Sequence, residues 1–171
     1  MKYLITGISG VGKTTVGEIL KKKGYRVIGI DEEHNLTKWF HKETGKKGEY
    51  TSGVSPEWLA QHEWLWDDKK MKELLDQQPN RPVFVYGLTS DIHKHVELFD
   101  KIFLLHVPAS VLKKRLAQRP GDDAFGRGKA ELEWIMTWQK EFEDGMRARG
   151  AIPIDAIAPI EEVVRNILER I

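Results

Sequence analysis

Five short apolar segments alternate along this chain of 171 residues with longer segments in which apolar residues recur every three or four positions. The short segments predict strands over 3–5, 26–30, 82–86, 101–107 and 151–154. The periodic segments predict helices over 13–23, 32–44, 55–78, 91–99, 109–118, 129–149 and 159–171, and glycine-rich stretches predict loops over 45–54 and 119–128. Alternating strands and helices pack as a parallel sheet whose crossovers cover both faces. We therefore predict an α/β fold, a three-layer sandwich around a five-stranded parallel sheet.

A chain of this length is expected to form one domain, and no repeat or linker divides residues 1–171. It contains no cysteine, which excludes disulfides, thiolate-bound metals and a thiol nucleophile. Its 27 Lys and Arg balance 26 Asp and Glu, so no overall charge attracts it to nucleic acid or to a membrane surface. The longest apolar stretches have about six residues, and a membrane span needs roughly 20. We expect a cytoplasmic protein that has neither nucleic acid nor membrane as a partner.

The first predicted strand leads into Gly7-Ile8-Ser9-Gly10-Val11-Gly12-Lys13-Thr14, which matches G-x-x-x-x-G-K-[ST] at every fixed position. Glycines let the backbone curl so that successive amides point at phosphate oxygens, and the positive end of the following helix adds to the attraction. In such a loop the lysine reaches the outer phosphates and the Thr14 hydroxyl binds Mg²⁺. The segment therefore predicts a site for a nucleoside triphosphate and Mg²⁺. The expected binding residues are Gly7, Ser9, Gly10, Val11, Gly12, Lys13, Thr14 and Thr15.

Further signals narrow the class of phosphate-binding protein. The chain lacks the Asn-Lys-x-Asp motif with which GTPases read their base. The predicted strand over 82–86 ends in Gly87 with no acid before Asp91, whereas nucleotide-driven motors carry an acid at that place. Farther along, residues 113–129 hold six basic and two acidic side chains, which predicts an anionic ligand held locally.

Together these features resemble the small P-loop kinases, the group of adenylate, shikimate and gluconate kinases. The resemblance covers nearly the whole chain. Besides the glycine-rich loop it rests on Asp31, on Tyr-Gly-Leu-Thr-Ser at 86–90, and on the segments 99–105 and 112–119. It implies a P-loop NTPase fold of the nucleotide-kinase type, with an acceptor-binding insertion over about 32–80 and a lid over about 119–128. It also implies ATP- and Mg²⁺-dependent transfer of the γ-phosphoryl group to a hydroxyl of a small molecule.

The same resemblance places Arg115 and Arg119 on the basic helix before the lid and Arg127 in the lid itself. In such kinases the lid closes over ATP, excludes water, and neutralises charge on the transferring phosphoryl group with guanidinium groups. Arg119 and Arg127 are therefore expected to be catalytic together with Lys13, and Arg115 is expected to bind the nucleotide. A helix cap or a surface ion pair is the alternative role for these arginines.

Asp31 ends the second predicted strand at the sheet edge where the phosphate loop ends the first. Ligands of open α/β sheets bind at this edge, so the carboxylate is expected to accept the proton of an acceptor hydroxyl or to bind Mg²⁺. Capping of the helix predicted to begin at Glu32 is the alternative. Glu32 and Glu33 are expected to be acids of the first turn of that helix.

The acceptor is not identified by the motifs. Shikimate kinases have an Asp-x-Asp and a glycine triplet, where this chain has Asp-Glu-Glu at 31–33 and Gly-Leu-Thr at 87–89. The Asp-Gly-Phe-Pro-Arg run of adenylate kinases is absent. Aromatic rings crowd the predicted insertion and either stack on the acceptor or pack a core under a long loop. They are Trp39, Phe40, His41, Tyr50, Trp58, His62, Trp64 and Trp66. Trp134 and Trp138 are expected in the core, and residues 89–91 either contact the acceptor or cap the next helix.

Two functions are compatible with this sequence. The first is an ATP-dependent kinase, with a nucleoside triphosphate and an unidentified small-molecule acceptor as its partners. The second is an ATP-binding regulatory or NTP-hydrolysing module without a small-molecule acceptor, which the missing acceptor motifs favour.

Overall fold

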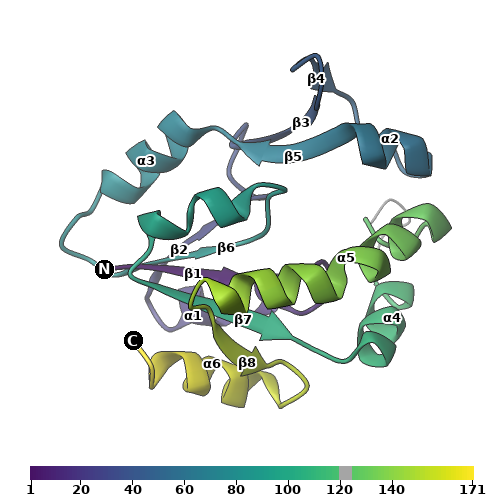
Figure 1. Cartoon of the computed structure of the whole chain (residues 1–171). Helices are drawn as coiled ribbons and strands as arrows, with labels where there is room; N and C mark the ends of the chain where they lie inside the picture. The colour runs from purple at the N-terminus through teal and green to yellow at the C-terminus, as the bar shows by residue number, and fades with distance from the viewer. Residues whose placement is uncertain (120–124) are drawn as a thin grey trace.

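The computed structural model describes residues 1–119 and 125–171 and contains the predicted five-stranded parallel sheet (Figure 1). Its strands are β1 (Lys2–Thr6), β2 (Arg26–Gly29), β6 (Val83–Tyr86), β7 (Lys101–His106) and β8 (Ile152–Asp155), in the order β2-β6-β1-β7-β8. Every neighbouring pair is parallel, and Ile5 of the central β1 lies beside Tyr86 and Phe103. Because β1 is held between two strands, the place where the glycine-rich loop begins is fixed.

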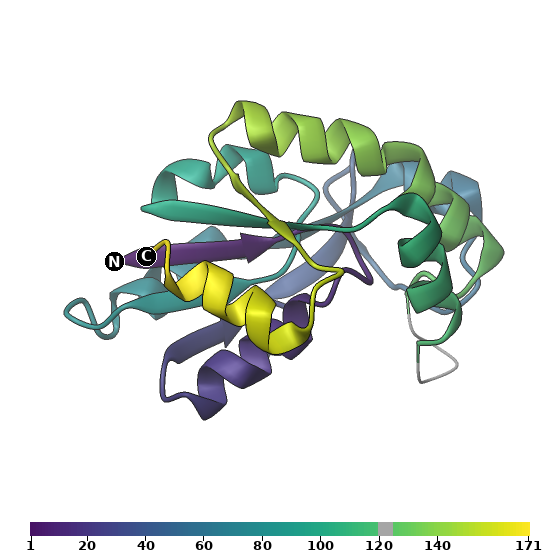
Figure 2. The same cartoon turned by 90° about the horizontal axis from the view of Figure 1, so that it is seen from below.

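Helices cover both faces of this sheet, which confirms the three-layer prediction (Figure 2). Helices α1 (Lys13–Lys22) and α6 (Ile160–Leu168) lie on one face, and α5 (Lys129–Ala148) and α3 (Asp68–Asp76) contribute to the other. Helix α4 (Ala109–Ala117) follows β7 and packs against α5. The helices predicted over 13–23, 109–118, 129–149 and 159–171 are thus present with small changes at their ends.

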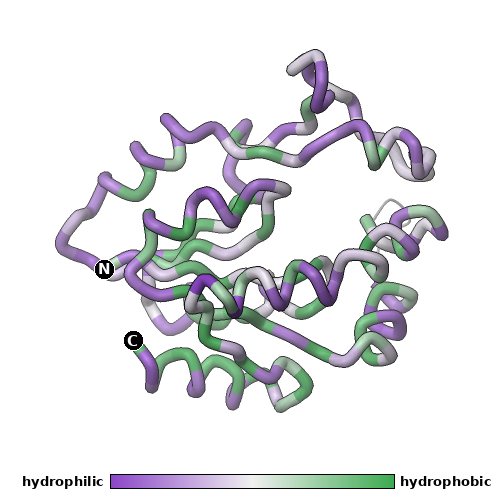
Figure 3. Tube along the Cα trace, viewed as in Figure 1, coloured by the Kyte–Doolittle hydropathy of each residue, from purple (hydrophilic) through white to green (hydrophobic). Residues whose placement is uncertain are grey.

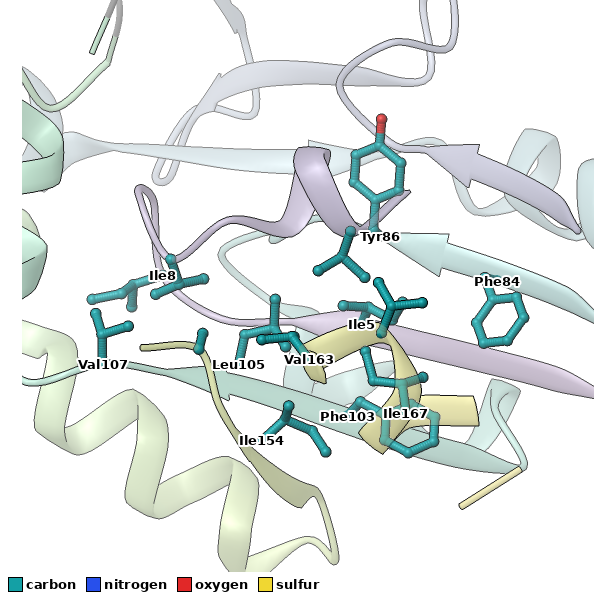
Figure 4. Packing of buried hydrophobic residues seen from close by; sticks show 14 of the residues in the cluster. Ile5, Ile8, Phe84, Tyr86, Phe103, Leu105, Val107, Ile154, Val163 and Ile167 are labelled. Carbon is teal, nitrogen blue, oxygen red and sulfur yellow. The ribbon is translucent and has the colours of Figure 1, made fainter. Parts of the chain in front are cut away.

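Two apolar cores result from the alternation of side chains along the strands. Tyr3 and Ile5 face the core beneath α1 and α6, whereas Leu4 faces the core on the opposite side of the sheet. Figure 4 shows Ile5 and its neighbours from several strands packed against Val163 and Ile167 of α6. Figure 3 shows apolar residues concentrated in the central strands. Burying one such side chain stabilises the fold by about 1.5–3 kcal/mol, so the sheet is a rigid base for the loops at its edge.

The segment between β2 and β6 differs most from the prediction. The helix predicted over 32–44 is wrong, and the helix predicted over 55–78 is interrupted by a strand. Residues 30–36 form turns, and the chain continues as β3 (Thr37–His41), β4 (Lys47–Gly48), α2 (Pro56–Gln61), β5 (His62–Trp66) and α3. The three strands form a second, antiparallel sheet in the order β4-β3-β5.

The physical reason for this difference is pairing between two aromatic segments. Trp39 lies opposite Trp64 in the β3–β5 ladder, and cross-strand aromatic pairs stabilise antiparallel strands. The predicted helix does begin as expected, since the Ser55 hydroxyl accepts a hydrogen bond of 3.2 Å from the Trp58 amide. It ends after two turns at β5, and a new helix begins where the Asp67 carboxylate accepts from the Lys70 amide at 3.0 Å.

Two smaller predictions also change. The helix predicted over 91–99 consists of two 3-10 turns, η1 (Ile92–Lys94) and η2 (Val96–Leu98), and β4 lies inside the loop predicted over 45–54. The predicted lid, 119–128, falls partly outside the described residues, because 120–124 are not among them. In the part of the chain that is described, none of the helices has the length and apolar character needed to cross a bilayer.

Candidate active site

The glycine-rich loop connects the end of β1 to the start of α1. Gly7 has φ +149° and approaches β7 so closely that a Cβ there would lie 2.5 Å from the Leu105 carbonyl oxygen. Gly12, the residue before α1, has φ +108°, a conformation that favours glycine. No side chain caps α1 and its first turn has no acidic residue, so its first amides and its positive end are available to an anion.

Lys13 folds back over this loop. Its ammonium donates hydrogen bonds to the carbonyl oxygens of Gly7 at 2.7 Å and Ile8 at 3.0 Å. The pKa of Lys13 is lowered from 10.5 to about 8, because burial disfavours the charged ammonium; Asp31 opposes this shift, and Arg119 adds to it. A bound phosphate would replace the two carbonyl contacts with a stronger charge-assisted one.

Asp31 lies in the turn after β2, on the same side of the sheet as the loop. The indole of Trp64 on β5 donates a hydrogen bond of 3.0 Å to its carboxylate. Asp31 remains open to solvent, but the surrounding cleft walls reduce its hydration and raise its pKa, while Lys13 and Trp64 partly oppose this. The helix-cap alternative for Asp31 is wrong, because no helix begins at residue 32.

The two acids that follow Asp31 are therefore not residues of a first helical turn, as predicted. Glu32 instead accepts a hydrogen bond from the Tyr86 hydroxyl and pairs with Lys21 of α1 at 2.9 Å. These contacts tie the turn after β2 to β6 and to α1. They hold the backbone of Asp31 in place at the sheet edge.

The predicted arginines occupy three different environments. Arg119 donates to the Ser9 hydroxyl at 3.0 Å and to the Phe125 carbonyl at 2.9 Å, so it joins the glycine-rich loop to the segment just before α5. Arg115 donates to the Val11 carbonyl at 3.1 Å and the Ala156 carbonyl at 2.8 Å. Arg127 is exposed and does not line the cleft described next.

One cleft of about 1190 Å³ contains most of these groups. The loop half of this cleft is lined by Ser9, Gly10, residues 12–15, Arg115, Gln118 and Arg119. The remaining lining is Asp31 together with residues of β3, β5, α5 and the neighbouring segments, and we call this part the aromatic half. A smaller cavity of about 350 Å³ lies behind the loop, between Val11, Thr15, Arg115 and the start of α6.

Aromatic rings form the wall of the aromatic half. The ring of Trp39 lies 5.2 Å from Trp58, 5.4 Å from Trp64 and 6.0 Å from Tyr50, measured between centroids. These rings are half-buried and line the cleft or pack behind it, so they do not form a closed core. By contrast, Trp66 is 6% exposed and does belong to the core beneath α3.

Trp134 and Trp138 on α5 were expected in the core; Trp138 packs against the core beneath α1 and α6 as well as lining the cleft, whereas the prediction is wrong for Trp134, which is not part of either core. Each is half-buried and lines the cleft opposite the second sheet. The ammonium of Lys42, which follows β3, lies 6.0 Å from the centroid of the Trp134 ring. The α5 helix thus presents aromatic side chains to a ligand site as well as to the core.

Residues 89–91 do not cap η1, since Asp91 makes no side-chain capping bond. Thr89 and Ser90 line the cleft, and Ser90 is bonded to the backbone of Trp64 in both directions at 2.8 Å. The Asp91 carboxylate instead lies 3.1 Å from His95. The Ser90–Trp64 pair fastens β5 to the end of β6 and so places the Trp64 indole against Asp31.

Sequence reasoning missed Glu131, a carboxylate that is only 1% exposed. It accepts hydrogen bonds from the Gly126 amide at 2.8 Å and the Gly128 amide at 3.3 Å at the start of α5. The Tyr50 hydroxyl, 81 residues away, donates to it at 2.5 Å. A glutamate in the first turn of a helix after glycine was the only local signal. Glu131 connects the second sheet to the residues that hold Arg119.

Comparison with known proteins agrees with this geometry. The family model described as "AAA domain" matches residues 4–135. The chain belongs to this family. It is also 25% identical over 197 residues to a thymidylate kinase from Coprothermobacter proteolyticus, covering 100% of this chain and 98% of that protein.

Solved structures with the same fold are small P-loop kinases, as the motifs predicted. A gluconokinase from Sinorhizobium meliloti has a TM-score of 0.52 and 23% identity, covering 96% of this chain and 87% of its own. A deoxyadenosine kinase from M. mycoides with bound dATP has a TM-score of 0.54 and 18% identity, with coverage of 99% and 98%. These likenesses establish the fold of this family member.

Proposed function

We propose that this protein is an ATP-dependent kinase that transfers the γ-phosphoryl group to a hydroxyl of a small molecule. The observation that carries the proposal is a single cleft with a phosphate-binding loop on one side and the carboxylate of Asp31 on the other. The relatives act, by their names, on thymidylate, gluconate and deoxyadenosine, which supports a small acceptor but does not select one.

The loop half is suited to hold the triphosphate. The amides from Gly10 to Thr15 and the ammonium of Lys13 supply donors and positive charge in a confined site, where charge-assisted bonds are strong. Arg115 lines both the cleft and the smaller cavity, so we assign the nucleoside of ATP to that cavity. The apolar side chains of Val11 and Ile160 would pack against the base.

The residues present fit Mg²⁺ as kinases bind it. Among the described residues, no cluster of three or more His, Asp or Glu could hold a metal by itself. Mg²⁺ keeps several waters and takes one or two protein oxygens plus substrate phosphates, so such a cluster is not required. Thr14 and Asp31 both present oxygens to the cleft and would hold the ion. When bound, Mg²⁺ supplies neutralisation of the charge on the phosphates.

Asp31 is the group that handles the acceptor. The Trp64 indole fixes the orientation of the carboxylate, whose oxygens can accept a proton from an acceptor hydroxyl. The acceptor hydroxyl would donate its proton to Asp31 while its oxygen faces the γ-phosphoryl group. Arg119, already bonded to Ser9 of the loop, lies where it can stabilise charge on the transferring group.

A product assay tests the proposal. The protein is incubated with MgATP and panels of nucleosides, sugars and hydroxy acids, while ADP and the phosphorylated products are followed by chromatography and mass spectrometry. We expect one class of acceptor to raise ADP release and to appear as a phosphate ester. Slow ADP release that no acceptor changes would instead identify a hydrolysing or regulatory module.

A further inference from the structure

The two halves of the cleft carry opposite charge. Lys13, Arg115 and Arg119 line the loop half, and no acidic residue lines it in the described part of the chain. In the aromatic half three acids, Asp31, Glu63 and Glu141, face two bases, with histidine counted as neutral. Residues 120–124, which are not described, contain two aspartates and no basic residue.

The two bases of the aromatic half donate hydrogen bonds to backbone carbonyls. Lys42 donates to the Ala60 carbonyl at 2.6 Å, and Arg149 donates to the Gly145 carbonyl at 2.8 Å. Both side chains are exposed at the rim. Glu63 is half-buried and Glu141 is exposed, and neither has an ion-pair partner among the described residues. The lysine and arginine keep their positive charge, so the aromatic half has a formal charge of −1 and is less favourable for an anion than the loop half.

The shape and chemistry of the walls favour a flat ring. Trp39 and Trp64 lie on the second sheet, and Trp134 and Trp138 line the same cleft from α5. Aromatic walls offer large apolar faces and few hydrogen-bonding groups, so they suit stacking better than the recognition of many hydroxyls. Asp31, at the boundary of the two halves, lies where a hydroxyl attached to such a ring would meet the γ-phosphoryl group.

We infer that the acceptor of the proposed kinase reaction is an uncharged alcohol that carries a flat ring, with a nucleoside as the representative of this class. The inference rests on the proposed function for the reaction itself. The binding preference, however, follows from the charge and the rings of the aromatic half alone. This binding preference distinguishes the site from one that binds a nucleoside monophosphate or a sugar acid.

Matched pairs of ligands test the inference. Adenosine, guanosine, cytidine and thymidine are each compared with their 5′-monophosphates, and glucose and gluconate serve as a neutral and an anionic alcohol without a flat ring. Binding is followed by tryptophan fluorescence with saturating MgADP in the loop half, and turnover by ADP release from MgATP. We expect at least one nucleoside to bind and react about tenfold better than its monophosphate, because the phosphate adds roughly two negative charges.

The outcomes separate this inference from the proposed function. A nucleoside that binds more tightly than its monophosphate, without any turnover, would support the binding preference and contradict the kinase. Turnover with monophosphates, gluconate or glucose as the best acceptor would support the kinase and overturn the inference. Fluorescence that no nucleoside changes would also overturn it.

A charge reversal gives a second, independent test. Glu141→Lys is expected to improve the affinity of the monophosphate relative to its nucleoside about threefold at low salt, and the effect should shrink as salt is added. Glu133→Lys is the matched control, since Glu133 is an exposed acid on the same helix that does not line the cleft. Equal ratios in both variants would contradict the electrostatic argument.

Discussion

The loop half and the aromatic half of the cleft are built in different ways. The backbone amides and Lys13 of the loop half belong to one strand, one loop and one helix that are consecutive in sequence, and only Arg115, Gln118 and Arg119 come from a distant segment. The aromatic half takes side chains from β3, β5, α5 and the segment after β6, which are far apart in sequence. A phosphate can therefore be recognised by a short local motif, whereas the acceptor depends on how distant elements are packed together.

The loss of Lys13 is expected to have the largest effect, because it lies at the centre of the loop half. Lys13→Ala removes the positive charge that contacts the outer phosphates in both the ground state and the transition state. We expect kcat/KM for ATP to fall on the order of 10⁴-fold, with calorimetry showing loss of tight binding. Circular dichroism checks that the fold remains, and undiminished ATP affinity would remove Lys13 from this role.

Asp31→Asn probes the boundary between the two halves. The amide keeps the shape but cannot accept a proton from the acceptor hydroxyl, so we expect kcat to fall roughly 10²- to 10⁴-fold. The dissociation constant of ATP, measured by calorimetry, should change much less. If turnover is unchanged, Asp31 neither activates the acceptor nor holds the ion.

Arg119→Met tests the side chain that connects the loop half to the residues before α5. Removing one donor to the transferring phosphoryl group is expected to lower kcat about 10²- to 10³-fold in steady-state assays. Lys113→Met is the control, since Lys113 is exposed on α4, which ends two residues before Arg119, and does not line the cleft. Equal losses in the two variants would indicate a general effect of charge on α4.

The pH dependence of ATP binding reports on the loop half, because it follows the titration of Lys13. The pKa of Lys13 is lowered to about 8, so the unliganded protein loses this positive charge as the pH rises through that value. We expect the affinity for ATP to fall by up to about tenfold per pH unit above 8. Calorimetry near pH 8.5 should also detect proton uptake on binding, as a dependence of the heat on the buffer. Affinity that is constant to pH 9.5 would contradict the assignment.

Tyr50→Phe is expected to have the smallest effect, and it probes the contact between the halves. Loss of the hydroxyl that reaches Glu131 removes one hydrogen bond and leaves the rings of the wall in place. We expect a loss of about 1 kcal/mol of stability in urea unfolding, and a severalfold lower kcat/KM for the acceptor at unchanged ATP affinity. An equal effect on both substrates would show that this contact is structural only.

Local patterns explain which parts of the fold were predictable. Apolar residues form short runs in the parallel strands and recur every three or four positions in most of the helices that pack on them. The phosphate loop has its glycines at fixed spacing. In 32–44, by contrast, Leu36, Trp39 and Phe40 have helical spacing by coincidence. The segment around Trp39 and Phe40 forms a strand because it pairs with His62–Trp66, and a local pattern does not record a contact with a distant segment.

The sequence alone determined the parallel sheet, the phosphate loop and the position of Asp31 at the edge of the sheet, because each depends on neighbours within a few residues. Tertiary structure decided what those groups face. It placed Arg119 against Ser9, 110 residues away, and Tyr50 against Glu131. It also placed Trp134 on the cleft and Trp138 between the cleft and the core. Contacts over such separations follow from the packing of whole elements, and neither spacing nor composition records that packing.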